Sequence, residues 1–152
     1  MQQTVYLDNN ATTAIAGEVL EAMMPFFTAR YGNPSSIHSF GGSVARDIEL
    51  AREKVAALIG AEHAYEVVFT SGGTEADNFA ILGTLAADTA KRHIITTRVE
   101  HPAVLSVCRM LERDGCRVTY VPVDREGMLD TEFLKRSVAA DTAIVSGKIT
   151  PV

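Results

Sequence analysis

The chain has 152 residues, of which 47% are hydrophobic and 22% charged, and its formal net charge is −5 at pH 7. This composition is typical of an ordinary globular protein with one hydrophobic core, and a negative charge without a basic stripe argues against nucleic acid or an anionic membrane as a partner. No apolar run approaches the length of a membrane span, and residues 1–8 lack the basic and apolar regions of a signal peptide. Cys108 and Cys116 lack metal-ligand spacing, so we expect no metal site and a cytoplasmic location.

The first forty residues predict an arm and a loop that are not part of a sheet. Val5-Tyr6-Leu7 precede a polar, turn-forming stretch, and a helix broken near Pro25 follows. Residues 31–36 are again dense in turn formers. We assign residues 1–16 to an N-terminal arm.

From residue 43 onward, helix and strand patterns alternate along the chain. Gly60 is expected to stop the first helix, and Pro102 suits the first position of a later one, where a missing amide hydrogen does no harm. The predicted helices cover residues 43–59, 74–90, 102–115 and a segment capped by Asp130, and the predicted strands cover 66–70, 93–97, 117–121 and 142–146. Strands separated by helices imply right-handed crossovers and a mostly parallel sheet. The predicted fold class is therefore α/β, with a three-layer sheet flanked by helices.

Residues 67–78 have the features of an anion-binding turn. A predicted strand ends, Ser71-Gly72-Gly73 form a turn, and a helix begins near Thr74. Free backbone N–H groups and the positive end of a helix dipole would converge there, and the Ser71 and Thr74 hydroxyls could add donors. A plain turn with a Ser or Thr N-cap fits the spacing equally well. The absence of Walker and Gly-x-Gly-x-x-Gly patterns disfavours a nucleotide-binding domain but leaves a phosphorylated cofactor open.

His101 is the second candidate for a functional role. It follows the predicted strand 93–97 and precedes the helix start at Pro102. Because the carboxyl ends of parallel strands form the ligand edge of a sheet, we expect His101 and the 71–74 turn at the same edge of neighbouring strands. An imidazole there can stack on a planar ring and shuttle protons near neutral pH. By spacing alone, a role as a simple helix cap is somewhat favoured.

The other histidines and the cysteines carry less functional signal. His38 lies in a loop where a surface role is expected, and His63 and His93 are expected to be solvated. Cys108 and Cys116 fall in a helix and at a strand start, where a small buried apolar residue is usual. Neither is near a helix N-terminus or a base that would activate a thiolate.

Four motifs, in order along the chain, carry a resemblance to a known family. They are Tyr6-Leu7-Asp8-Asn9-Asn10-Ala11-Thr12-Thr13, Gly32-Asn33-Pro34-Ser35-Ser36-Ile37-His38, Phe69-Thr70-Ser71-Gly72-Gly73-Thr74-Glu75-Ala76-Asp77-Asn78 and Glu100-His101-Pro102-Ala103-Val104. With them the chain resembles class-V pyridoxal-phosphate (PLP) enzymes and, within that class, cysteine desulfurases of the NifS/IscS type, leaning to the nitrogen-fixation branch. The resemblance implies PLP-dependent transferase fold type I, incomplete here, with residues 17–146 as the N-terminal part of the large domain.

The resemblance also implies a reaction and roles for particular residues. Gly73 and Thr74 would bind the PLP phosphate, and His101 would stack on the pyridine ring and, as the catalytic residue, take part in proton transfer. The family converts L-cysteine to L-alanine with PLP as the electron sink, while an enzyme cysteine attacks the substrate sulfur. The resulting persulfide supplies an iron–sulfur scaffold protein, and the family enzymes are homodimers.

Two groups that the family reaction needs are not matched in this sequence. The family's Schiff-base lysine and sulfur-accepting cysteine lie beyond residue 146, and Lys148 does not match the family's Ser-x-His-Lys context. We interpret residues 147–152 as a non-homologous tail. We expect the chain alone to lack desulfurase activity and to be poorly soluble or partly molten. Alternatives are another class-V PLP enzyme, such as a selenocysteine lyase or an aminotransferase, and a truncated remnant without enzymatic function.

Overall fold

The structure is a computed structural model that describes residues 5–9 and 11–147. By its internal contacts the chain divides into two compact units, residues 1–68 and 69–152. The predicted tail at 147–152, Lys148 included, lies outside the described residues apart from Gly147. Across the described residues, none of the helices is long and apolar enough to cross a membrane.

The first unit contains helix α1 (Gly17–Thr28), helix α2 (Ser39–Ile59) and the short 3-10 helix η1 (Ala64–Glu66). The predicted break at Pro25 is wrong, because α1 continues through it to Thr28. Proline removes one N–H donor from the helix, but the Pro25 carbonyl still accepts from the N–H groups of Ala29 and Arg30, at 2.9 and 2.8 Å. The last turn therefore stays closed.

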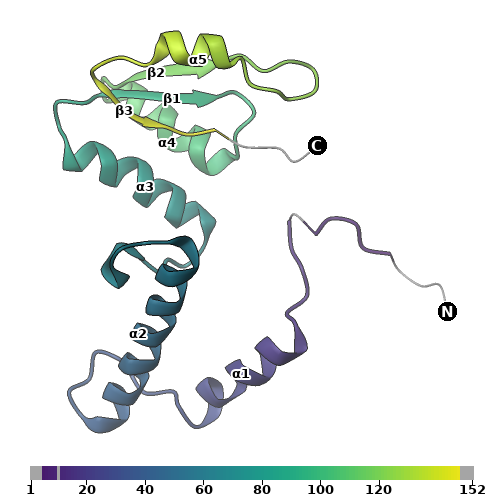
Figure 1. The fold of residues 1–152 in the computed structure, drawn as a ribbon, viewed down its shortest axis with the longest axis vertical. Coiled ribbons are helices and arrows are strands. Elements are labelled where there is room, and N and C mark those ends of the chain that lie inside the picture. Colours follow the sequence, from purple (N-terminus) through teal and green to yellow (C-terminus); the bar gives the residue numbers. More distant parts are fainter. Residues whose placement is uncertain (1–4, 10, 148–152) are drawn as a thin grey trace. The chain divides into compact units, whose positions relative to one another are not determined.

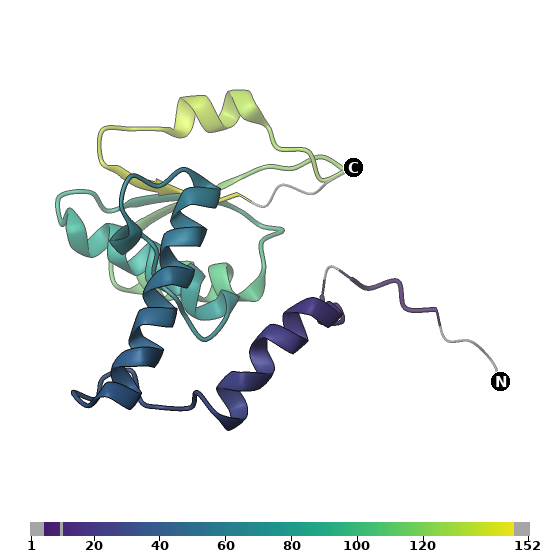
Figure 2. The ribbon, with the colours of Figure 1, turned by 60° about the horizontal axis from the view of Figure 1, so that its bottom comes forward.

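Helix α2 begins and ends at chemical signals that the sequence contains. His38 is its N-cap, and the ring Nδ1 accepts the Gly41 N–H at 3.2 Å. Gly60 ends the helix in the left-handed conformation, with φ of 72°, as predicted. Figure 2 shows the loop that joins α1 to α2, from which Arg30 pairs with Asp47 of α2.

The second unit is a three-layer α/β body. Its three strands form a parallel sheet in the order β2-β1-β3, with α3 and α4 on one face and α5 on the other (Figure 1). The elements are α3 (Gly73–Ala87), β1 (His93–Thr97), α4 (Pro102–Arg113), β2 (Arg117–Val121), α5 (Thr131–Ser137) and β3 (Thr142–Val145). The predicted fold class is confirmed, and the helix start at Pro102 and the Asp130 cap of α5 agree with the prediction.

The core of this unit lies between the sheet and helices α3 and α4. Helix α4 contributes most of it because its apolar residues recur at helical spacing and face the sheet. Ile81 of α3 and Ile94 of β1 complete the contact, and both are almost fully buried. The buried cluster consists of Ile81, Ile94, Val104, Val107, Cys108, Leu111 and Cys116.

The predicted strand at residues 66–70 is wrong. Glu66 ends η1, and residues 67–70 run without sheet pairing. A strand needs a neighbour to hydrogen-bond, and β1 already has β2 on one side and β3 on the other. Residues 67–70 pair with none of the strands that the structure describes.

Candidate functional site

The N-terminus of α3 has no side-chain cap, which leaves its first N–H groups available to an anion. Its N-cap, Gly72, has no side chain to bond the first turn, and the first hydrogen bond of the helix runs from the Ala76 N–H to the Gly72 carbonyl at 3.1 Å. The N–H groups before it have no partner within the helix. A Cβ placed on Gly72 or Gly73 would meet no atom within 4 Å, so the space beside both residues is open, and a helix start with free N–H groups suits a phosphate.

The side chains of the turn differ from the prediction in one respect. Ser71 does not face an open site, because its N–H and its hydroxyl both donate to the Glu75 Oε2, at 2.7 and 2.6 Å. The Ser71 hydroxyl bond, followed by the Ser71 N–H bond, lowers the pKa of Glu75. Thr74 is exposed, and its carbonyl accepts from the Asn78 amide at 2.7 Å.

His101 is the N-cap of α4, so it has the capping role that its position before Pro102 favours. Its Nδ1 accepts the Ala103 N–H at 3.2 Å. The ring is exposed, and an acceptor Nδ1 places the proton of the neutral ring on Nε2. The loop before it is held by Glu100, whose Oε1 accepts from the Thr97 hydroxyl at 2.8 Å in a buried contact. Capping thus orients His101 while leaving Nε2 and the ring faces accessible.

The turn at 71–74 and His101 lie at the same edge of the second unit, although they do not follow neighbouring strands. The turn at 71–74 opens α3 and His101 opens α4, and these two helices pack against each other. Figure 1 shows both helices starting on the side toward which β1 points. The expected shared edge is therefore formed by two helix N-termini instead of two strand ends.

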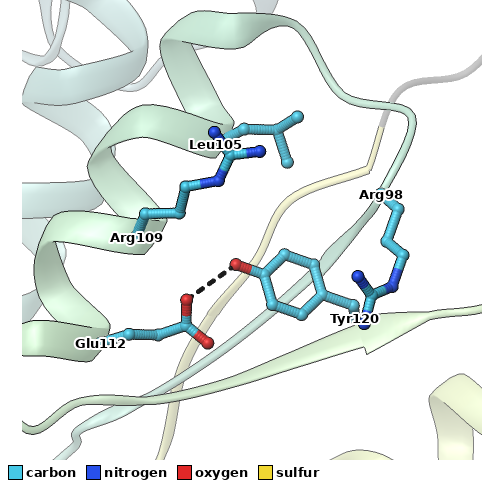
Figure 3. Close-up of a pocket in the computed structure, with 5 residues that line it drawn as sticks. All are labelled: Arg98, Leu105, Arg109, Glu112 and Tyr120. Carbon is cyan, nitrogen blue, oxygen red and sulfur yellow. Dashed lines mark hydrogen bonds between the residues drawn. The ribbon is translucent and has the colours of Figure 1, made fainter.

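The structure also contains a cavity that sequence reasoning missed. It has a volume of about 380 Å³ and is lined by Arg98, Leu105, Arg109, Glu112 and Tyr120. Figure 3 shows the Tyr120 ring between Arg98, which lies 5.1 Å from the ring centroid, and Glu112, which accepts the phenol hydrogen at 3.0 Å. Burial and then the Glu112 bond raise the pKa of Tyr120. No local motif signals this cavity, because its lining combines a loop, one helix face and a strand.

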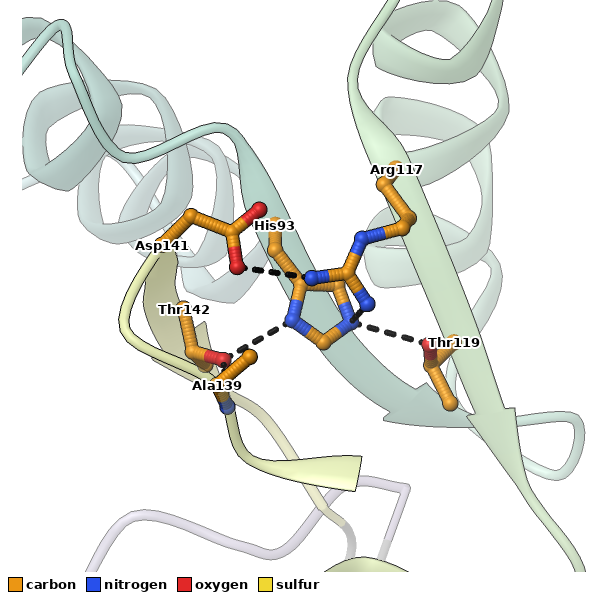
Figure 4. A network of polar contacts seen from close by, with 6 residues as sticks. All are labelled: His93, Arg117, Thr119, Ala139, Asp141 and Thr142. Atoms are coloured by element: carbon orange, nitrogen blue, oxygen red, sulfur yellow. Dashed lines mark hydrogen bonds and ion pairs between the residues drawn. The ribbon is translucent and has the colours of Figure 1, made fainter. Parts of the chain in front are cut away.

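His93 is buried, contrary to the expectation that it is solvated. Because β2 and β3 flank it, its ring bonds to both neighbours (Figure 4). Arg117 can only donate, so Nε2 accepts from it at 3.1 Å and the proton of the neutral ring is on Nδ1, which donates to the Thr142 hydroxyl oxygen at 2.8 Å. The Thr119 hydroxyl lies 2.9 Å from Nε2 and shares this acceptor. Arg117 also pairs with Asp141 at 2.7 Å. This network belongs to the start of the strands, away from the candidate site, and its role is structural.

Neither cysteine is an activated nucleophile. Cys108 and Cys116 are both buried, as predicted for small apolar positions. Burial, followed by the charges of Glu112 and Glu100, raises the pKa of Cys108 to about 11. His63 is exposed, as expected, and stacks on Tyr65.

Comparison with known proteins identifies the family. A model of the class-V aminotransferases matches residues 5–150. The chain belongs to the class-V aminotransferase family. This family uses PLP, and the residues at the start of α3 fit the phosphate of that cofactor.

Relatives within this family are cysteine desulfurases. The "Cysteine desulfurase" of Trichormus azollae is 56% identical over 142 residues, and the "Cysteine desulfurase NifS" of Azotobacter vinelandii is 51% identical; each match covers 93% of this chain and 35% of the relative. Among solved structures, "NIFS-LIKE PROTEIN" has a TM-score of 0.88 at 42% identity and "SspA in complex with cysteine" one of 0.86 at 34% identity. Each of these two structural matches covers 95% of this chain. The first covers 40% of the matched protein and the second 42%. The chain spans about 35% of the length of these curated relatives, and the resemblance to cysteine desulfurases is confirmed.

Proposed function

We propose that this chain forms the N-terminal part of the PLP-binding domain of a cysteine desulfurase. The reaction converts L-cysteine to L-alanine and transfers the sulfur to an enzyme cysteine as a persulfide for iron–sulfur cluster assembly. The observation that carries the proposal is the start of α3 at Gly72 and Gly73, which has no side-chain cap and has open space beside both glycines. The names and identities of the relatives support the choice of this reaction within the family.

The proposed roles come from the family resemblance, and the geometry of each residue supports them. The Gly73 and Thr74 N–H groups, with the Thr74 hydroxyl, hold the cofactor phosphate at the positive end of the α3 dipole. Bound PLP supplies an electron sink for the substrate amine. His101 offers a ring face for stacking and carries its neutral-state proton on Nε2, since Nδ1 holds the α4 cap. Nε2 is therefore the atom that gives or takes the proton.

The remaining groups of the reaction come from outside the described residues in this proposal. By family resemblance, the lysine and the sulfur-accepting cysteine lie beyond residue 146. Cys108, with its pKa raised to about 11, is unsuited to nucleophilic attack at neutral pH. The homodimer, the iron–sulfur scaffold protein as sulfur acceptor, the cytoplasmic location and the nitrogen-fixation role belong to the same proposal.

A chimera tests the function directly. Residues 5–146 of this chain replace the matched segment of the Azotobacter vinelandii relative, and release of sulfide and alanine from L-cysteine is measured. We expect turnover, and a loss of about a hundredfold or more in the chimera with His101→Ala, in line with a proton-transfer residue. His63→Ala, an exposed histidine elsewhere, is the matched control and keeps the activity. A chimera that binds PLP but releases no sulfide would contradict the proposal, as would full activity in the His101 variant.

A further inference from the structure

One carboxylate oxygen beside the bare start of α3 receives two hydrogen bonds from a single residue. Glu75 is the third residue of α3, and its Oε2 accepts both the Ser71 N–H and the Ser71 hydroxyl. A serine hydroxyl has one proton to donate, and here that proton is used. The Thr74 hydroxyl, by contrast, donates to no acceptor in the part of the chain that the structure describes.

The position of Glu75 explains why this contact forms. Gly72 cannot cap the helix with a side chain, so the shape of the preceding turn must be held by another group. A glutamate at the third helical position commonly reaches back to donors before the helix, and its charge is favourable near a helix N-terminus. Both Ser71 bonds lower the pKa of Glu75, and no charged side chain contributes to that shift. Glu75 therefore stays ionised near neutral pH and keeps its two donors.

We propose that Glu75 is a positioning residue of the phosphate site: it holds Ser71 in the turn, so that of the two hydroxyls in this turn the one of Thr74 binds the phosphate. This inference rests on the proposed function of the site and deepens it. The sequence leaves the hydroxyls of Ser71 and Thr74 equivalent, whereas the contacts occupy the Ser71 hydroxyl with Glu75 and leave the Thr74 hydroxyl available to a ligand.

Two properties of Glu75 act in opposite directions on phosphate affinity. Its hydrogen bonds order the turn, while its negative charge repels a phosphate dianion nearby. Glu75→Ala loses the ordering, whereas Glu75→Gln keeps an acceptor for Ser71 and removes the charge. We therefore expect weaker binding in the alanine variant, and recovery to at least the wild-type affinity in the glutamine variant.

The experiment has one arm without ligand and one with ligand. In the first, NMR follows the titration of the Glu75 carboxyl in the wild type and in Ser71→Ala. The pKa is expected to rise toward its ordinary value of 4.5 in the variant. In the second, affinities are measured for pyridoxine 5′-phosphate, which carries the ring and phosphate of PLP but no aldehyde to react with lysines. Thr74→Val is expected to weaken binding about tenfold and Ser71→Ala less than about threefold, since only the former loses a bond to a charged group.

The outcomes separate this inference from the proposed function. Equal losses in Ser71→Ala and Thr74→Val, or a Glu75 titration that Ser71→Ala leaves unchanged, would overturn the positioning role while the cofactor site stands. A wild type that is folded by circular dichroism and still fails to bind pyridoxine 5′-phosphate overturns the proposed cofactor site itself. Circular dichroism of each variant confirms that these exposed substitutions leave the fold intact.

Discussion

Substituting His93 by glutamine is expected to remove a pH dependence from the stability of the protein. The His93 ring is fully buried, and Nε2 accepts from Arg117 and the Thr119 hydroxyl. A proton on Nε2 would turn this acceptor into a donor that faces another donor. Burial, followed by the Arg117 charge, lowers the pKa of His93 from its ordinary value of 6.5, and Asp141 offsets this in part.

The sign and size of the effect follow from linkage. Above pH 6.5 neither the folded nor the unfolded chain binds a proton at His93, so the stability from the neutral network is fully present. As the pH falls below 6.5, the unfolded chain is protonated first, and the free energy of unfolding drops. One proton changes it by at most about 1.4 kcal/mol per pH unit.

The assay is urea unfolding followed by circular dichroism at about pH 7.5 and about pH 5.5, where a histidine changes its charge. Glutamine keeps one donor and one acceptor, so His93→Gln is expected to cost about 1–2 kcal/mol at the higher pH and to flatten the dependence. His63→Gln, at an exposed histidine, serves as the control and keeps the wild-type profile. The reasoning fails if His93→Gln retains the wild-type pH dependence, or if the wild type shows none over this range.

Three further predictions concern the Thr96 hydroxyl, the Cys108 thiol and the backbone at Gly60. Thr96→Val raises the free energy of unfolding by about 1 kcal/mol, because the buried Thr96 hydroxyl has no partner among the described residues. Thr119→Val removes a bond to His93 and is the control, which lowers the free energy of unfolding in the same urea titration. Cys108 reacts with a thiol reagent at pH 8 only after unfolding, since a pKa of about 11 leaves roughly a thousandth of it as thiolate; rapid labelling of the native protein would argue against its burial. Gly60→Ala costs about 1 kcal/mol because φ is 72° there, and an unchanged unfolding midpoint would contradict this.

Local chemistry made several elements predictable from the sequence. Gly60 as a left-handed helix end, Pro102 at a first helical position and Asp130 as an N-cap each act through their own backbone or within a few residues. The resemblance rested on motifs of the same local kind, and the family comparison confirmed it. These features need no knowledge of what lies across the sheet.

Two of the errors concern contacts between distant segments. Residues 66–70 have the composition of a strand, but a strand forms only where a neighbour pairs with it, and residues 67–70 pair with none of the described strands. His93 was expected to be solvated because it begins a strand, but it is buried. Its partner Thr142 lies 49 residues away in the sequence, so no local pattern indicates this contact. The Ser71–Glu75 contact spans only four residues and could have been inferred from an acid in the first turn of a helix.

The central claim is that the start of α3 binds the phosphate of the cofactor, and its most direct test compares two ligands that differ only in that group. Binding of pyridoxine 5′-phosphate and of pyridoxine is measured by calorimetry on the same protein, with inorganic phosphate as competitor. We expect the phosphorylated ligand to bind at least about tenfold more tightly, as loss of a charge-assisted contact implies, and phosphate to displace it. Equal affinities for the two ligands, with no competition by phosphate, would contradict the account.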